Sequence, residues 1–247
     1  MAEDKRVNNT GQGLQNVNVS ENRRPHQIIS EFLELLRANI RLVVAVIAVS
    51  IFLFLLSEVL QGELMRLDRI AISLFVMRLR TPWLTPIMEA FSALATPVVL
   101  LVLLLVVIAF APGRAPGWCC TINLVLVVLL NQILKFIVQR PRPEGFRLAV
   151  VSGFSFPSGH SMVAMAFFGL LAWFVWRYEK NRWMRNLLVI AFSIVILMIG
   201  ISRVYLGVHY ASDVLAGFCV SLVWLTLYTR LAVPVFLRDK PAISNDH

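Results

Sequence analysis

The chain has 247 residues, of which 58% are hydrophobic and only 15% are charged, and its formal net charge at pH 7 is +9. A soluble domain carries more charge, and the apolar residues here form long runs rather than an amphipathic alternation. Composition therefore excludes a soluble enzyme and predicts one integral-membrane domain. The excess of Lys and Arg is attributed to cytoplasmic loops and to contacts with anionic lipid headgroups. Nucleic-acid binding is not expected, since no basic face interleaved with aromatic residues is present.

The first polar segment precedes any apolar run, so a signal peptide is not expected there. Residues 1–25 are rich in Asn, Gln, Arg and Glu, which predicts a disordered cytoplasmic tail. Residues 26–41 place apolar side chains at helical spacing, which predicts an amphipathic juxtamembrane segment. The membrane domain is predicted over residues 42–232, and residues 233–247 are predicted to form a cytoplasmic C-terminal tail.

A helix that crosses a bilayer needs about 20 mainly apolar residues. Six segments meet this requirement, and together they predict an all-α fold, a bundle of six transmembrane helices. The predicted spans are Leu42–Leu60, Ile87–Ala111, Trp118–Ile137, Met162–Tyr178, Leu187–Ile201 and Ala211–Leu231.

The segment between the first two spans has a different pattern. Its apolar run, residues 70–77, is too short to cross a membrane and is flanked by arginines. We expect an interfacial helix there, followed by a turn at Thr81, Pro82 and Pro86. The three cysteines, Cys119, Cys120 and Cys219, have neither a disulfide pattern nor metal-ligand spacing, and they are expected to be small buried side chains.

The distribution of cations predicts the orientation of the bundle. With the N-terminus inside, the cytoplasmic segments carry more Lys and Arg than the outer ones, so both termini are predicted to be cytoplasmic. Lys135 ends the third span, His160 opens the fourth, and His209 lies between the fifth and sixth. In any six-span arrangement these residues share one side of the membrane, and this orientation makes that side extracytoplasmic.

The last polar cluster contains Ser202, Arg203, His209 and Asp213. His209 and Asp213 are four residues apart, which on a helix places them on one face. Asp213 would then accept a hydrogen bond from one imidazole nitrogen and leave the other as a nucleophile. Arg203 suits bidentate contact with phosphate oxygens. Taken alone, the cluster also fits an interfacial histidine with a helix-pairing aspartate.

The middle cluster is the run from Phe156 to Ser161. Ser158 is a candidate N-cap for the fourth span, and Gly159 permits close approach of the backbone to a ligand. The free N–H groups of a helix start bind anions, and His160 beside them could protonate a leaving alkoxide. The alternative is a capped helix start with an incidental histidine.

The first cluster is Lys135 followed by Arg142 and Pro143. Lys135 closes the third span, and the prolines at 141 and 143 prevent the helix from continuing. By itself this pattern also fits a stop-transfer sequence whose cations reach the lipid headgroups.

In order, the clusters read Lys-x6-Arg-Pro, Pro-Ser-Gly-His and Ser-Arg-x5-His-x3-Asp. This pattern resembles that of the type 2 phosphatidic acid phosphatase superfamily, over roughly residues 68–231. The resemblance implies that a phosphohistidine forms on His209, that Asp213 orients it, and that His160 acts first as acid and then as base for water. It also implies a metal-free site without a cofactor, in which the phosphoryl oxygens are held by Lys135, Arg142, Ser158, Gly159 and Arg203.

The function expected from this resemblance is hydrolysis of a lipid phosphate or pyrophosphate in a bacterial cytoplasmic membrane. The implied substrates include undecaprenyl pyrophosphate, phosphatidylglycerophosphate and phosphatidate. The partners expected are the lipid substrate and the bilayer, with no obligate protein partner. Two alternatives remain: phosphotransfer between lipids at the same site, and a non-catalytic anion transporter. Arg140 and Arg147 lie outside the pattern and are interpreted as headgroup contacts or solvated charges.

Overall fold

The computed structural model describes residues 39–62, 64–111 and 113–237. The chain divides into two units, Met1–Val43 and Val44–His247, and the architecture below is that of the second. The tail predicted over residues 1–25 lies outside the described residues, as do residues 26–38 of the juxtamembrane segment and residues 238–247 of the C-terminal tail.

Within the described ranges every regular element is helical, which confirms the predicted all-α class. Five helices are long and apolar enough to cross a membrane, and a bent pair makes a sixth candidate span. The elements are α2 (Ile40–Leu60), α3 (Arg66–Ala71), the π-helical η1 (Ile72–Arg78), α4 (Leu84–Ala93), α5 (Pro97–Phe110), α6 (Ala115–Val138), α7 (Gly159–Tyr178), α8 (Arg182–Tyr205), α9 (Ala211–Leu231) and α10 (Val233–Phe236).

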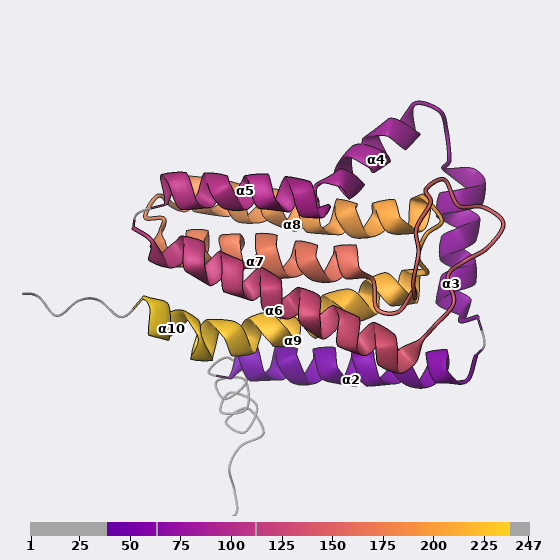
Figure 1. Ribbon diagram of the computed structural model, residues 1–247, viewed down its shortest axis with the longest axis horizontal. Helices are drawn as coiled ribbons and strands as arrows, with labels where there is room; N and C mark the ends of the chain where they lie inside the picture. Colours follow the sequence, from indigo (N-terminus) through magenta and orange to yellow (C-terminus); the bar gives the residue numbers. More distant parts are fainter. Residues whose placement is uncertain (1–38, 63, 112, 238–247) are drawn as a thin grey trace, which may run out of the picture. The chain divides into compact units, whose positions relative to one another are not determined.

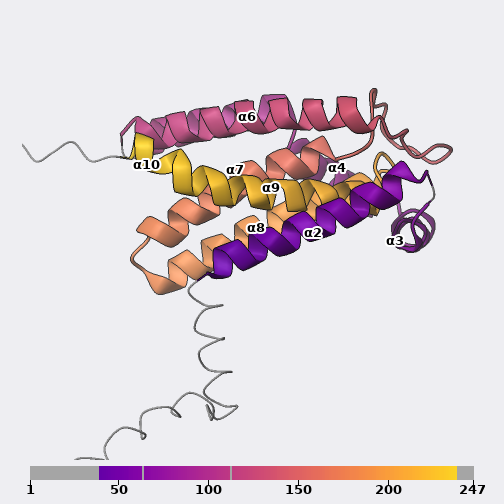
Figure 2. The ribbon, with the colours of Figure 1, turned by 90° about the horizontal axis from the view of Figure 1, so that it is seen from below.

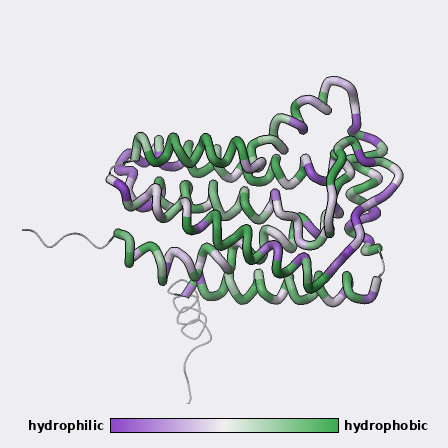
Figure 3. Tube along the Cα trace, viewed as in Figure 1, coloured by the Kyte–Doolittle hydropathy of each residue, from purple (hydrophilic) through white to green (hydrophobic). Residues whose placement is uncertain are grey.

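Helix α7 is the central element of the bundle, and it contacts α6, α8 and α9 (Figures 1 and 2). Its buried face includes Met162, Phe167 and Leu170, each with no exposed surface. Polar contacts add to this packing, because the Asn123 side chain donates to the Ala166 carbonyl and accepts from the indole of Trp224. Many large apolar side chains on the helices are exposed, as a lipid-facing surface requires. The traces of the long helices are mostly hydrophobic along their length (Figure 3).

The second predicted span is not one straight helix. α4 and α5 meet at an angle of 58° (Figure 1). Pro97 begins α5, and its ring disfavours helical geometry at the preceding residue, so Thr96 is extended with ψ 151°. The bend lets α4 pack against α8 while α5 packs against α6.

Local sequence signals set where α6 ends and where α7 begins, at the same end of the bundle. α6 stops at Gln139, whose left-handed φ of 51° is followed by the prolines at 141 and 143. α7 begins after Ser158, whose hydroxyl accepts the N–H of Ser161, as the sequence predicted for an N-cap. α3 lies across this end (Figure 1) and contacts α9. The three cysteines are buried and unpaired, as expected.

Candidate active site

The three predicted clusters come together at this end of the bundle, although they belong to different helices. Nη1 of Arg142 lies 3.0 Å from Nε2 of His209. Lys135 interacts electrostatically with Arg142, Arg203 and Asp213, and His160 interacts with His209 and Arg203. One composite site therefore contains charged side chains from the ends of α6, α7, α8 and α9.

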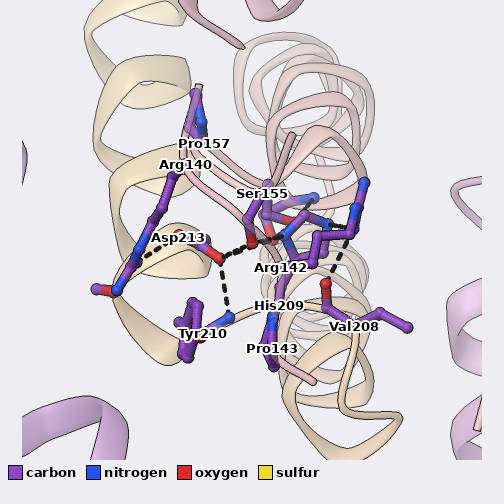
Figure 4. A network of polar contacts seen from close by, with 12 residues as sticks. Arg140, Arg142, Pro143, Ser155, Pro157, Val208, His209, Tyr210 and Asp213 are labelled. Atoms are coloured by element: carbon purple, nitrogen blue, oxygen red, sulfur yellow. Dashed lines mark hydrogen bonds and ion pairs between the residues drawn. The ribbon is translucent and has the colours of Figure 1, made fainter. Parts of the chain in front are cut away.

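His209 and Asp213 form the centre of this site (Figure 4). Nδ1 of His209 lies 3.4 Å from Oδ2 of Asp213 and 3.3 Å from Oγ of Ser155. The Ser155 hydroxyl donates to the same carboxylate oxygen, which also accepts the backbone N–H of Tyr210 at 2.8 Å. This oxygen of Asp213 is thereby held by the Ser155 hydroxyl and the Tyr210 N–H, and its position sets that of the imidazole.

The backbone holds His209 outside a helix, which differs from the sequence expectation of a shared helical face. α8 ends at Tyr205 and α9 begins at Ala211, so His209 lies in the turn between them. Gly207 makes this turn possible with a φ of +70°, and a Cβ there would lie 2.7 Å from the Phe146 carbonyl oxygen. The N–H of His209 donates to the Arg203 carbonyl at 3.3 Å. The turn and this hydrogen bond therefore fix the backbone position of His209.

The hydrogen bonds define the tautomer of His209. A guanidinium only donates, so Nε2 must accept the bond from Arg142 and carries no proton. The proton of the neutral ring is then on Nδ1, facing Asp213 and Ser155. Nε2 has its lone pair on the side of the motif cations, which is the arrangement a nucleophilic imidazole needs.

Burial favours this neutral form. The His209 ring is 2% exposed, and burial lowers its pKa from the usual 6.5 to about 4. The hydrogen bond and charge of Asp213 raise the pKa, and Arg142 and Arg203 lower it. The net shift keeps Nε2 unprotonated throughout the neutral pH range.

Arg142 and Arg203 differ in how many of their N–H groups have a hydrogen-bond partner. Arg142 donates to the carbonyls of Gly153, Val208 and Ser152 as well as to His209. Arg203 is 4% exposed, donates to the Ser92 hydroxyl, and has a buried Nε without a partner among the described atoms. A buried unpaired donor is costly, so this Nε is suited to an anion that enters the site.

The start of α7 forms the remaining side of the site. Ser158 has no exposed surface, and its N–H donates to the Asp213 carbonyl at 3.0 Å. A Cβ at Gly159 would lie 2.9 Å from Oδ1 of Asn131, so a larger residue here would displace that side chain of α6. The half-buried His160 ring has no side-chain hydrogen bond to any described residue, which leaves both nitrogens available for a substrate.

The interpretation of Arg140 as a headgroup contact or a solvated charge was wrong. Its side chain is 8% exposed and bridges two carboxylates, at 2.7 Å from Asp213 and 3.0 Å from Asp68, neither of which has exposed surface. Its guanidinium carbon also lies 4.1 Å from the centre of the Tyr210 ring. Burial lowers the Arg140 pKa, but the two carboxylates raise it above its usual value.

Arg147 is exposed and donates to the carbonyls of Pro143 and Arg142.

Two further residues were not found from the sequence, Asp68 and Ser155. Asp68 lies on α3 and accepts the backbone N–H of Ser212 at 2.9 Å and its hydroxyl at 2.8 Å. In the sequence, Asp68 stands alone between arginines, a pattern that does not predict a buried carboxylate. Ser155 lies just ahead of the Pro-Ser-Gly-His motif, and only that proximity could have identified it.

The charges of the site favour a dianion. Arg140 is matched by Asp68 and Asp213, whereas Lys135, Arg142 and Arg203 have no carboxylate of their own among the described residues. With Lys135 protonated, four cations face two carboxylates, an excess of two positive charges. A phosphate dianion would neutralise this excess.

Comparisons with known proteins agree with this geometry. The family model of the PAP2 superfamily matches residues 116–235. Phosphatidylglycerophosphatase B of Bacillus subtilis is 34% identical over 183 residues, which are 70% of this chain and 89% of that protein. Lipid A 1-phosphatase of Rhizobium johnstonii is 36% identical over 120 residues, 44% of this chain and 43% of that protein.

A solved structure supports the same assignment. The crystal structure of a transmembrane PAP2-type phosphatidylglycerolphosphate phosphatase from Bacillus subtilis superposes with a TM-score of 0.65 at 30% identity, covering 74% of this chain and 94% of that one. These matches define the protein as a helical membrane phosphatase. More narrowly, the chain belongs to the PAP2 superfamily and is a lipid phosphate phosphatase of that family.

We expect Arg140→Gln to lower kcat at least about tenfold with a smaller change in KM, because Asp213 and Asp68 lose the cation that positions them. Leaving buried carboxylates unpaired costs about 3–5 kcal/mol, so the unfolding midpoint should fall by roughly 10 °C. Steady-state kinetics and thermal unfolding in detergent measure both effects. Arg114→Gln, which removes an exposed arginine, is the matched control, and Arg140→Lys should be intermediate. Wild-type kcat and stability in Arg140→Gln would contradict the positioning role.

We expect the His209 ring to remain neutral, with its proton on Nδ1, between about pH 5 and 8. Because its pKa is lowered to about 4, the unprotonated Nε2 is present above that value and is lost only as the pH falls through it. NMR of the protein labelled with ¹⁵N-histidine measures the titration, and the signal is assigned by its loss in His209→Ala. A His209 signal that titrates near the ordinary value of about 6.5 would contradict this expectation.

Proposed function

We propose that the protein hydrolyses a phosphomonoester or pyrophosphate bond of a membrane lipid through a phosphohistidine on His209. The observation that carries this proposal is the placement of the His209 ring, whose Nε2 lies 3.0 Å from Arg142 while its Nδ1 faces Asp213 at 3.4 Å. A nucleophile next to a group of cations suits attack on a phosphorus atom whose oxygens carry the charge.

In the first step the lone pair of Nε2 attacks phosphorus, and the bond from phosphorus to the lipid oxygen breaks. Arg142 must release Nε2 and transfer its donor to a phosphoryl oxygen, alongside Arg203 and Lys135. Protonated His160 gives its proton to the departing lipid oxygen. As Nε2 becomes bonded to phosphorus the ring gains positive charge, which Asp213 stabilises through Nδ1–H.

In the second step water attacks the phosphohistidine. The neutral His160 accepts a proton from that water, the bond from phosphorus to Nε2 breaks, and inorganic phosphate leaves. The ring returns to its neutral form, with its proton still on Nδ1. Ser158 and the backbone N–H groups at the start of α7 supply further donors to the phosphoryl oxygens.

The chemistry that we propose uses no metal. Among the described residues, no group of three or more His, Cys, Asp or Glu side chains is placed to hold a metal ion. The charge that a metal would supply comes instead from Arg142, Arg203 and Lys135.

The lipids that we propose as substrates are phosphatidylglycerophosphate, undecaprenyl pyrophosphate and phosphatidate. The relative that covers 70% of the chain is a phosphatidylglycerophosphatase by name, which supports the first. The predicted extracytoplasmic position of the site supports the second. Each presents a terminal phosphate at the membrane interface, where the ends of α6 to α9 form the site.

We expect the purified protein to release phosphate from at least one of these lipids in the presence of EDTA, and His209→Ala to abolish release. The ranking of the lipids by kcat/KM identifies the substrate. A protein-bound phosphate that is labile to acid and stable to base would identify the phosphohistidine. The mutant His160→Ala should slow both steps, by about 10² to 10⁴ in total.

The controls separate this proposal from its alternatives. Transfer of labelled phosphate to a second lipid, without free phosphate, would identify a phosphotransferase. Full activity in His209→Ala, or loss of activity on adding EDTA that zinc or magnesium restores, would contradict the mechanism. Arg114→Gln is expected to match the wild type in every assay.

We also propose that the protein lies in a bacterial cytoplasmic membrane with both termini inside and the active site outside. This proposal rests on the excess of Lys and Arg in the segments assigned to the cytoplasm. The loop between α6 and α7 would then face outward, and the loop between α7 and α8 inward.

Single engineered cysteines test this orientation. Val150 is fully exposed in the loop between α6 and α7, and Lys180 is exposed between α7 and α8. In intact cells whose outer barrier is permeabilised, we expect a membrane-impermeant maleimide to label Val150→Cys and to label Lys180→Cys only after lysis. The native cysteines are buried and serve as the background control. The opposite labelling pattern would reverse the assignment.

A further inference from the structure

The outward face of α3 and η1 has a basic hollow that the catalytic site does not use. It has a volume of about 440 Å³. Arg66, Arg69 and Ser73 are spaced three and four residues apart, as on one face of a helix, and Arg78 is one turn beyond. Its lining consists of Arg66, Arg69, Ile70, Ser73, Leu74 and Arg78.

The opposite face of the same segment is fixed to the bundle. Asp68 has no exposed surface and bonds Ser212 and Arg140, and Ala71 is buried beside Val204 and Val214. The arginines of the hollow therefore cannot turn inward to the catalytic residues. The hollow and the active site share no lining residue, so an anion bound in the hollow is not a substrate in position for reaction.

The three arginines of the hollow have no partner within the described part of the chain. Among the described residues, no ion pair and no side-chain hydrogen bond involves Arg66, Arg69 or Arg78. Exposed apolar side chains lie between them: Ile70 is 55% exposed and Leu74 is 41% exposed. Cations adjoining exposed apolar side chains suit a ligand that has both an anionic headgroup and a hydrocarbon chain.

We propose that this hollow is an accessory binding site for an anionic membrane phospholipid, whose phosphodiester contacts Arg66, Arg69 and Arg78. Its hydrocarbon chain would lie along Ile70 and Leu74. The position supports this, because α3 and η1 lie across the end of a bundle of membrane-length helices (Figure 1), where headgroups are found. Inorganic phosphate supplies the same charge but no chain, and the test distinguishes the two.

Binding is measured by native mass spectrometry of the full-length protein in detergent, titrated with phosphatidylserine or phosphatidylcholine. Phosphatidylserine is used because it is a phosphodiester, which a phosphomonoesterase neither cleaves nor releases. We expect tighter binding of phosphatidylserine, and at least about tenfold weaker binding in the triple variant R66Q/R69Q/R78Q. Each cation near a lipid surface contributes roughly fivefold to affinity.

A matched variant at the other end of the bundle controls for charge. R177Q/K180Q/R182Q removes three exposed cations and should leave phosphatidylserine binding within about twofold of the wild type. Phosphatidylserine should also raise the unfolding midpoint of the wild type more than that of R66Q/R69Q/R78Q, because a ligand that binds the folded state stabilises it. If the triple variant does not fold, R69Q alone should weaken binding by about fivefold.

Several outcomes would overturn the proposal. One is equal binding of phosphatidylserine and phosphatidylcholine. Another is phosphatidylserine binding that is unchanged in R66Q/R69Q/R78Q, or weakened equally in both triple variants. The last is displacement of the lipid by equimolar inorganic phosphate. The unfolding midpoint of R66Q/R69Q/R78Q without added lipid should match that of the wild type, which shows that it is folded. Because lipid binding is measured without turnover, failure of the proposed function would leave this result interpretable.

Discussion

The ion pairs of Arg140 are the constraint on which the rest of the site depends. Its guanidinium joins the two carboxylates of Asp68 and Asp213, all three being at most 8% exposed. None of these charges would be tolerated there alone, because a buried charge without a partner is costly. Their mutual satisfaction fixes the interfacial helix α3, the chain after α6 and the start of α9 against one another. The first role of this ion-pair bridge is therefore structural: it holds three segments of the chain in position around the site.

The same bridge determines how His209 is presented. Asp213 uses one oxygen for Arg140 and the other for Ser155, Tyr210 N–H and His209. Because Arg140 holds the first oxygen, the second cannot rotate away from the imidazole. The cations of the site thus form two sets with different roles. Arg140 is neutralised and structural, whereas Lys135, Arg142 and Arg203 retain the uncompensated charge that a phosphate requires.

The sequence predicted those parts of the structure that depend on local pattern. Long apolar runs predicted the helices, prolines and Ser158 predicted where α6 ends and α7 begins, and motif spacing predicted which residues meet. It did not predict contacts whose partners are far apart in the chain. Asp68 and Arg140 are separated by 72 positions, and each alone resembles an interfacial charge. The bend before α5 could have been inferred from Pro97, since proline restricts the residue before it.

The difference between Arg142 and Arg203 indicates how a substrate would enter this site. Arg142 is satisfied by three carbonyls and by Nε2 of His209, so it covers that nitrogen in this structure. Arg203 retains an unpaired buried Nε, so an incoming phosphate gains most by contacting it first. In the proposed mechanism, Arg142 would then exchange Nε2 for a phosphoryl oxygen and expose the lone pair. Under the proposed mechanism, the substrate phosphate therefore draws Arg142 away from Nε2 of His209 and exposes the nucleophile. Water carries no negative charge, so it does not displace the guanidinium from Nε2.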